Sequence, residues 1–194
     1  MRVLQPSLKE LFYRVITGEM SLPDFEQWLY ASAEVEQLLS ADDYLALLTL
    51  NYRKSGAKYE LYNLLRKLID LGEFETYKML KRVQEAKQKT PQLPFILMEF
   101  YDLYCRGYHF LQDLGLDYGL AVEVPRIANT TTDTWDDLTR LQQQELLTSF
   151  SPGLELELSR VLHWLVTRQL ILTGEQNDWG RYTYLDLRSS SERR

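Results

Sequence analysis

Residues 21–30 read Ser21-Leu22-Pro23-Asp24-Phe25-Glu26-Gln27-Trp28-Leu29-Tyr30, and this stretch has the pattern of an amphipathic helix. Ser21 is a favourable N-cap residue, and Pro23 lies in the first turn, where its missing N–H costs nothing. Phe25, Trp28 and Leu29 follow at helical spacing. The pattern therefore predicts a short helix with one buried apolar side.

The same pattern of a cap followed by apolar residues extends to both sides of this stretch. Before it, Ser7–Glu10 has the form of a capping box, and Gly18 suits a helix end. After it, Ser32 and Ser40 are suited to open two further helices. The first part of the chain is thus expected to be a series of short helices.

A longer helix is expected at residues 57–71, ended by Gly72, and another at residues 74–83. The second helix carries cations on its other faces, including Lys78, Lys81 and Arg82. These cations form either an ordinary solvated helix face or a docking surface for an acidic partner.

Two prolines mark a boundary at Thr90–Pro94, because proline resists both helix and inner strand. We expect a helical segment at residues 1–92, a second segment at 93–188 and a frayed tail at 189–194. The two segments either pack as one unit or form separate domains. The second segment starts with an aromatic helix at about residues 95–114 that bends at Gly107.

The second segment has a different order of elements. A strand is expected at 120–124, a polar loop at 129–133, a helix at 134–149 and another at 152–168. Two strands at 169–173 and 182–187, joined by a loop at 174–180, read as a β-hairpin. The predicted fold class is therefore mainly α, with a small C-terminal hairpin, and the element order is that of a winged helix.

A winged helix that binds nucleic acid needs cations and polar side chains on its recognition helix. The helix at 152–168 instead carries Glu155 and Glu157 near its start, balanced by Arg160 and Arg168. Carboxylates there favour the helix dipole but would face phosphates. A structural or protein-binding wing is the preferred interpretation, and a nucleic-acid-binding regulator is the alternative.

Charge is unevenly distributed along the chain. Residues 1–52 hold 3 Lys and Arg against 8 Asp and Glu, residues 53–89 hold 10 against 5, and residues 90–194 hold 9 against 15. The net charge of −6 disfavours broad nucleic-acid affinity, with the basic middle segment as a local exception. The acidic segments are suited to steer a basic partner such as a nuclease domain.

Composition and the single cysteine, Cys105, indicate a cytoplasmic protein. One cysteine excludes an internal disulfide, and the N-terminus lacks the apolar run of a secretory signal. The longest apolar runs are far shorter than the roughly 20 residues of a membrane helix. We expect no contact with membrane and no cofactor.

Catalytic and phosphate-binding motifs are absent from the sequence, so we expect a protein that is not an enzyme. Asp102, Cys105 and His109 are spaced to share a helix face and are weak candidates for a metal or thiol site, although they lack a fourth ligand. An unrecognised enzyme or small-ligand binder therefore remains an alternative. The acid pairs at 42–43 and 136–137 are explained by helix capping.

The composition is unusual in its high number of aromatic residues, with 13 Tyr and 4 Trp. Most are expected in the core, but Tyr and Trp also suit the centres of interfaces. The candidates for partner binding are Trp28, Tyr30, Trp135 and Trp179.

Three stretches, Asp24–Tyr30, Val35–Leu39 and Asp43–Leu48, resemble small bacterial proteins of the toxin-immunity type. The stretches Tyr104–Leu111 and Tyr184–Arg188 are similar to the same group. The resemblance covers about a third of the chain and implies a bacterial, cytoplasmic protein that binds and neutralises a toxin domain. With the missing chemistry, the segregated charge and the aromatic surplus, it favours a non-enzymatic interaction module of the immunity or antitoxin type.

Overall fold

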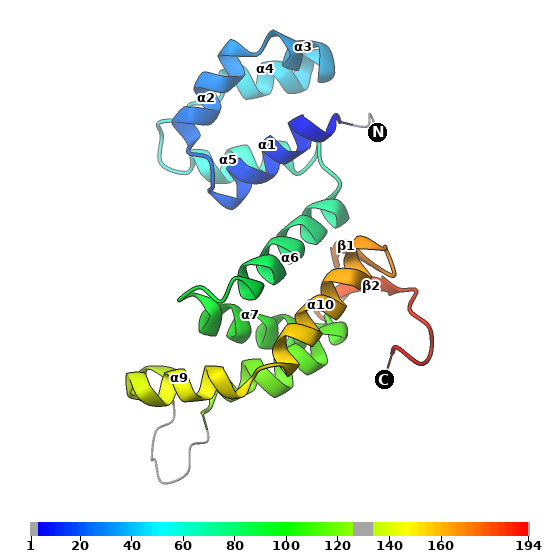
Figure 1. The fold of residues 1–194 in the computed structure, drawn as a ribbon. Coiled ribbons are helices and arrows are strands. Elements are labelled where there is room, and N and C mark those ends of the chain that lie inside the picture. The colour runs from blue at the N-terminus through cyan, green and yellow to red at the C-terminus, as the bar shows by residue number, and fades with distance from the viewer. Residues whose placement is uncertain (1–3, 126–133, 194) are drawn as a thin grey trace. The chain divides into compact units, whose positions relative to one another are not determined.

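The computed structural model describes residues 4–125 and 134–193, which fall into two compact units (Figure 1). The N-terminal unit ends at Phe74 and the C-terminal unit begins at Glu75, so the division lies inside helix α6 (Leu71–Lys87). This division differs from the predicted boundary at Thr90–Pro94. Over the described residues the chain is mainly helical with a two-stranded antiparallel hairpin near the C-terminus, which confirms the predicted fold class.

The N-terminal unit is built from short helices, which are α1 (Pro6–Thr17), α2 (Leu22–Ala31), α3 (Ala33–Leu38), α4 (Ala41–Thr49), α5 (Ala57–Leu65) and the start of α6. Helix α1 packs against α5, whereas α2 and α3 pack against α4 (Figure 1).

Serine caps fix the starts of α2 and α4, as predicted. Ser21 Oγ accepts a hydrogen bond from the Asp24 N–H, and Ser40 Oγ accepts one from the Asp43 N–H, both at 3.2 Å. Each serine hydroxyl in turn donates to the aspartate carboxylate at 2.6 Å. These local bonds satisfy groups that a helix start leaves unpaired, so both helices begin where the sequence indicates.

Phe25 is the centre of the core of this unit. Its side chain is fully buried, and its ring lies 6.2 Å from that of Phe12, 5.7 Å from that of Trp28 and 6.0 Å from that of Tyr52. The Tyr52 hydroxyl donates to the Leu47 carbonyl oxygen at 2.9 Å. One side chain of α2 thus joins α1, α2 and the segment that follows α4.

The predicted helix at residues 57–71 is wrong in its second half. Helix α5 ends at Leu65, and α6 begins at Leu71. The Asp70 carboxylate accepts a hydrogen bond from the Glu73 N–H at 2.8 Å, which caps the new helix. Gly72 therefore lies in the first turn of α6 instead of ending the preceding helix.

The C-terminal unit contains the rest of α6 and further short helical segments before the hairpin. These are α7 (Leu93–Cys105), the 3-10 helix η1 (His109–Leu111), the π-helix η2 (Leu114–Gly119), α8 (Leu120–Glu123), the 3-10 helix η3 (Trp135–Asp137), α9 (Arg140–Ser149), α10 (Gly153–Val166), β1 (Leu170–Gln176) and β2 (Tyr182–Asp186).

Close packing of α7 against η2 and α8 makes the predicted strand at 120–124 wrong. A Cβ atom at Gly119 would clash with the Leu97 carbonyl oxygen and lie 2.8 Å from the Tyr101 Cβ. Only glycine lets the two helical segments approach this closely, and the approach buries Val122. The apolar run is therefore a buried helical segment. Periodicity alone cannot distinguish a strand from such a segment when the apolar run is this short.

The predicted aromatic helix is also interrupted, because α7 stops at Cys105. Gly107 has a φ of 117°, which other residues rarely adopt, and a Cβ there would lie 2.8 Å from the Tyr182 carbonyl oxygen. The Arg106 carbonyl oxygen accepts a hydrogen bond from the Tyr182 N–H at 2.8 Å. Contact with β2 thus ends the helix at the predicted bend.

The hairpin agrees with the sequence. Leu170 pairs with Asp186 and Leu172 with Tyr184, and the side chains of both leucines are buried. Without the strand at 120–124, however, the described residues lack the first strand of a winged helix, so the predicted element order is wrong there. The predicted polar loop at 129–133 lies outside the described residues.

Replacement of Phe25 by alanine tests the assigned core of the N-terminal unit. We expect Phe25→Ala to lower the free energy of unfolding by about 3–5 kcal/mol, because it leaves a cavity among three aromatic rings. The exposed Tyr59 is the control, and Tyr59→Ala should change that free energy by less than about 0.5 kcal/mol. Urea denaturation of the full chain measures both, and equal losses would contradict the assignment.

Candidate protein-binding surface

The candidate metal or thiol residues do not share a helix face. Asp102 and Cys105 belong to α7, but the turn at Gly107 takes His109 into η1, where its ring lies 5.8 Å from that of Tyr104. Cys105 is exposed, and a hydrogen bond with its side chain raises the pKa of Tyr101. Within residues 4–125 and 134–193, no three His, Cys, Asp or Glu side chains are placed to hold a metal ion.

The aromatic candidates have different surroundings. Trp135 is only 8% exposed and packs in the core of the C-terminal unit, so its side chain offers little surface to a partner. Trp28 is half-buried beside Phe25. Tyr30 is 59% exposed, and its hydroxyl donates to the Leu48 carbonyl oxygen at 3.3 Å.

Trp179 is the most exposed of the aromatic candidates, at 85%. It lies in the turn between β1 and β2, where the Asn177 side-chain oxygen accepts hydrogen bonds from the Trp179 and Arg181 N–H groups, both at 3.0 Å. The turn therefore holds an apolar ring in solvent. It presents no set of charges of one sign, because Asp178 and Arg181 flank the ring.

The basic candidates on α6 support the ordinary interpretation of that face. Arg82 pairs with Glu85 at 2.8 Å and with Glu99 at 3.0 Å. Lys78 pairs with Glu75 at 2.8 Å, and the third candidate, Lys81, is half-buried on the same helix. Because Arg82 and Lys78 already have acidic neighbours, they offer little unbalanced charge to an acidic partner.

Carboxylates are the prevailing charged groups on α2, α3 and α4 of the N-terminal unit. Not one Lys or Arg occurs between Arg14 and Arg53, although this stretch contains acids on three consecutive helices. We call the side chains of these acids the acidic surface, which consists of Asp24 and Glu26 on α2, Glu34 and Glu36 on α3, and Asp42 and Asp43 on α4.

No Lys or Arg in the described part of the chain forms an ion pair with the acidic surface. The cation–carboxylate pairs within the N-terminal unit are Lys9–Glu73 and Lys54–Glu60, at 2.5 and 2.7 Å. The three helices are adjacent, since α2 and α3 both pack against α4 (Figure 1). Their negative charge is thus concentrated, and no described Lys or Arg pairs with it.

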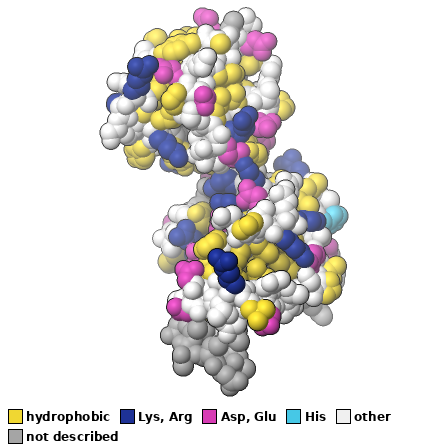
Figure 2. Space-filling model, turned by 60° about the vertical axis from the view of Figure 1, so that its left-hand side comes forward, with side chains coloured by type: hydrophobic (Ala, Val, Ile, Leu, Met, Phe, Trp, Pro, Cys, Tyr) yellow, Lys and Arg dark blue, Asp and Glu magenta, His cyan; other side chains and the backbone are white. Residues whose placement is uncertain are grey.

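Exposed apolar side chains accompany these carboxylates. Tyr30 on α2 and Leu45 on α4 are 59% and 58% exposed. Hydrophobic side chains are visible between charged ones on the face of the N-terminal unit drawn in Figure 2. Sequence reasoning found Tyr30 but missed Leu45, and the signal available for the surface was the long stretch without a cation.

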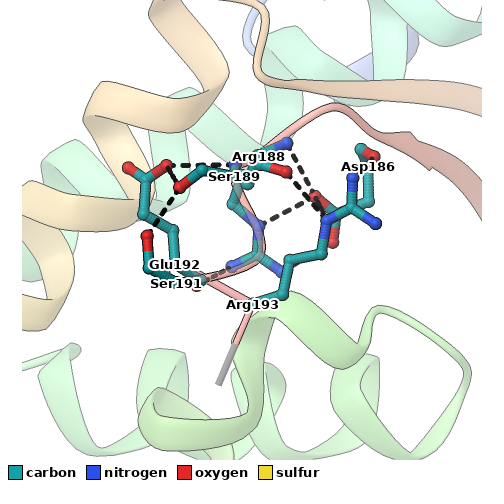
Figure 3. Close-up of polar contacts among 6 residues, drawn as sticks. All are labelled: Asp186, Arg188, Ser189, Ser191, Glu192 and Arg193. Atoms are coloured by element: carbon teal, nitrogen blue, oxygen red, sulfur yellow. Dashed lines mark hydrogen bonds and ion pairs between the residues drawn. The ribbon is translucent and has the colours of Figure 1, made fainter.

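A buried ion pair closes the hairpin (Figure 3). Arg188 is 8% exposed, its Nε and Nη2 donate to the Asp186 carboxylate at 3.0 and 2.8 Å, and its guanidinium lies 4.2 Å from the centre of the Trp164 ring. Arg193 donates to the carbonyl oxygens of Asp186 and Arg188, both at 2.8 Å. The predicted frayed tail is therefore bound to the hairpin as far as Arg193, and the cluster is a structural clamp.

Comparisons with known proteins assign the chain to no family. No protein-family model matches the chain, and no curated protein or solved structure shows significant similarity to it. Among the described residues, none of the helices has the length and apolar character needed to cross a membrane.

The clamp makes stability depend on pH in a defined direction. Hydrogen bonding to Arg188 lowers the pKa of Asp186 below its ordinary value of 3.8. A lowered pKa in the folded state stabilises the protein above the unfolded-state pKa, and this contribution is lost as pH falls through the folded-state value. We therefore expect Asp186→Asn to cost about 1.5–3 kcal/mol near neutral pH, and less at acidic pH.

Urea denaturation at a series of pH values measures the difference in unfolding free energy between the Asp186→Asn variant and the wild type. The exposed Glu175, which forms no ion pair with any described Lys or Arg, gives the matched control, because Glu175→Gln removes one carboxylate without breaking the clamp. A difference for Asp186→Asn that stays constant as pH falls from neutral to well below 3.8, the range that contains the lowered pKa of Asp186, would contradict the role of the ionised carboxylate.

Proposed function

We propose that the chain is a non-enzymatic protein-interaction module whose acidic surface binds a basic partner protein. The observation that supports the proposal is the concentration of carboxylates on α2, α3 and α4, in a stretch between Arg14 and Arg53 that contains no Lys or Arg. Neighbouring carboxylates without counter-charges repel one another, and a cationic partner relieves this repulsion when it binds.

An acidic surface of this kind acts on association before contact is made. Its field attracts a positively charged partner and raises the association rate, and the attraction weakens as salt screens the charges. Tyr30 and Leu45 then supply apolar area that a partner can cover after the encounter. The hydrogen bond from Tyr30 to α4 holds the ring in place and lowers the entropy lost on binding.

The position of the sequence resemblance supports a more specific form of the proposal. The three N-terminal stretches similar to toxin-immunity proteins lie on α2, α3 and α4, the helices that carry the acidic surface. We therefore propose a bacterial cytoplasmic protein of the immunity or antitoxin type, and a basic toxin domain, such as a nuclease, as its partner. Inhibition follows if the acidic surface covers the cationic site by which such a domain holds nucleic acid.

Neutralisation of three exposed carboxylates tests this proposal. A stoichiometric partner is first recovered from native lysate at low salt, and its affinity for the wild type is measured by calorimetry. We expect the triple variant Glu34→Gln, Glu36→Gln, Asp42→Asn to bind about tenfold or more weakly at low salt, and the difference to shrink at high salt.

The matched control removes three exposed carboxylates from the C-terminal unit, by Asp117→Asn, Glu145→Gln and Glu175→Gln. It has the same net charge as the first variant and should bind like the wild type. Equal weakening of binding in both triple variants would show that binding depends on net charge and not on the acidic surface. Failure to recover any stoichiometric protein, or recovery of an acidic protein or of nucleic acid alone, would contradict the proposal.

A further inference from the structure

A second surface of the N-terminal unit has the opposite character. Between α1 and α5 lies a groove of about 410 Å³ with an almost entirely apolar lining. Its walls include Ile16 of α1, Leu22 at the start of α2, and Tyr59 and Tyr62 of α5. Tyr59 is 71% exposed although it borders an apolar cavity. An exposed aromatic ring beside an unfilled apolar groove is typical of a binding site.

Two cations lie beside this groove. Lys58 lines it directly, and the Arg66 guanidinium lies 5.9 Å from the centre of the Tyr62 ring. Neither cation forms an ion pair with any described carboxylate, because the nearest acid on α5, Glu60, pairs with Lys54. The carboxylates of the acidic surface lie on α2, α3 and α4, whereas the residues that line the groove belong mainly to α1 and α5. The groove is therefore apolar inside and positively charged at its rim.

We propose that this groove binds an acidic amphipathic helix of a partner protein. The charge and the shape both point to this occupant. Lys58 and Tyr62 of α5, and Arg66 directly after its last turn, are spaced four residues apart, so they line up along one side of that helix, with Tyr59 beside them. A partner helix with apolar residues at every third or fourth position fills the groove, and its flanking Asp and Glu meet Lys58 and Arg66.

Other modes of recognition fit this surface less well. The described part of the N-terminal unit is helical and has no strand edge to which an extended peptide could be added. The helices of its own acidic surface already bury their apolar faces in the core, through Phe25, Val35 and Leu47. Those helices therefore cannot offer these apolar faces to the groove of a second copy of the chain. Because the partner is acidic, this site is distinct from the one that binds a basic partner.

A synthetic peptide tests the site without knowledge of the natural partner. The probe is a fluorescent helix with leucines at helical spacing and glutamates beside them, and fluorescence anisotropy measures its binding to the full chain. We expect saturable binding, with a dissociation constant raised about tenfold or more by Tyr59→Ala and by Lys58→Glu, and little changed by Lys58→Arg. A peptide of the same composition in scrambled order should bind at least about tenfold more weakly.

Phe95→Ala and Arg181→Glu are the matched control variants, because each changes an exposed aromatic or cationic residue outside the groove. Both should bind the peptide like the wild type, and circular dichroism confirms that all variants fold. The proposal is overturned if the scrambled peptide binds equally well, if the groove variants bind like the wild type, or if no peptide binds. It is also overturned if duplex DNA or anionic vesicles bind with the same dependence on Tyr59 and Lys58, or if Tyr59→Ala abolishes self-association of the chain.

Discussion

The packing of Phe25 is the interaction on which the N-terminal unit depends. Its buried ring contacts Phe12, Trp28 and Tyr52, so a single side chain of α2 holds α1 and the segment that follows α4 in position. The residues on either side of Phe25 in the sequence are Asp24 and Glu26, which belong to the acidic surface. One helix therefore supplies both the centre of the core and part of the charge. Loss of this packing would disturb the acidic surface and the α1–α5 groove together.

The two units differ in how far their charged side chains form ion pairs, and this difference is the physical basis for the functional proposals. In the C-terminal unit many cations have an acidic neighbour, as in the pairs Arg82–Glu99, Arg160–Glu157 and Arg188–Asp186. In the N-terminal unit the carboxylates on α2, α3 and α4 and the cations at the groove are separated instead of paired. Surface ion pairs contribute little to stability, so their absence costs little, while separated charge gives a field that guides partners.

Local signals made part of the structure predictable. Ser21 and Ser40 cap the helices that the sequence assigned to them, and the two strands of the predicted hairpin are present. The failures have a common cause in tertiary contact. The run at 120–124 is helical because Gly119 allows close packing against α7, and α7 ends where Gly107 meets β2. For the binding surface, sequence reasoning identified Tyr30 and the excess of acids, but burial of Trp135 depends on packing that composition does not reveal.

The central claim is that a basic partner meets the carboxylates of α2, α3 and α4. Carbodiimide cross-linking of the complex, followed by mass spectrometry, tests this claim directly because it joins a carboxylate only to a lysine in contact with it. We expect the cross-links from this chain to lysines of the partner to start at Glu34, Glu36 and Asp42. Cross-links that start instead at carboxylates of the C-terminal unit, such as Glu145 or Glu175, would contradict it.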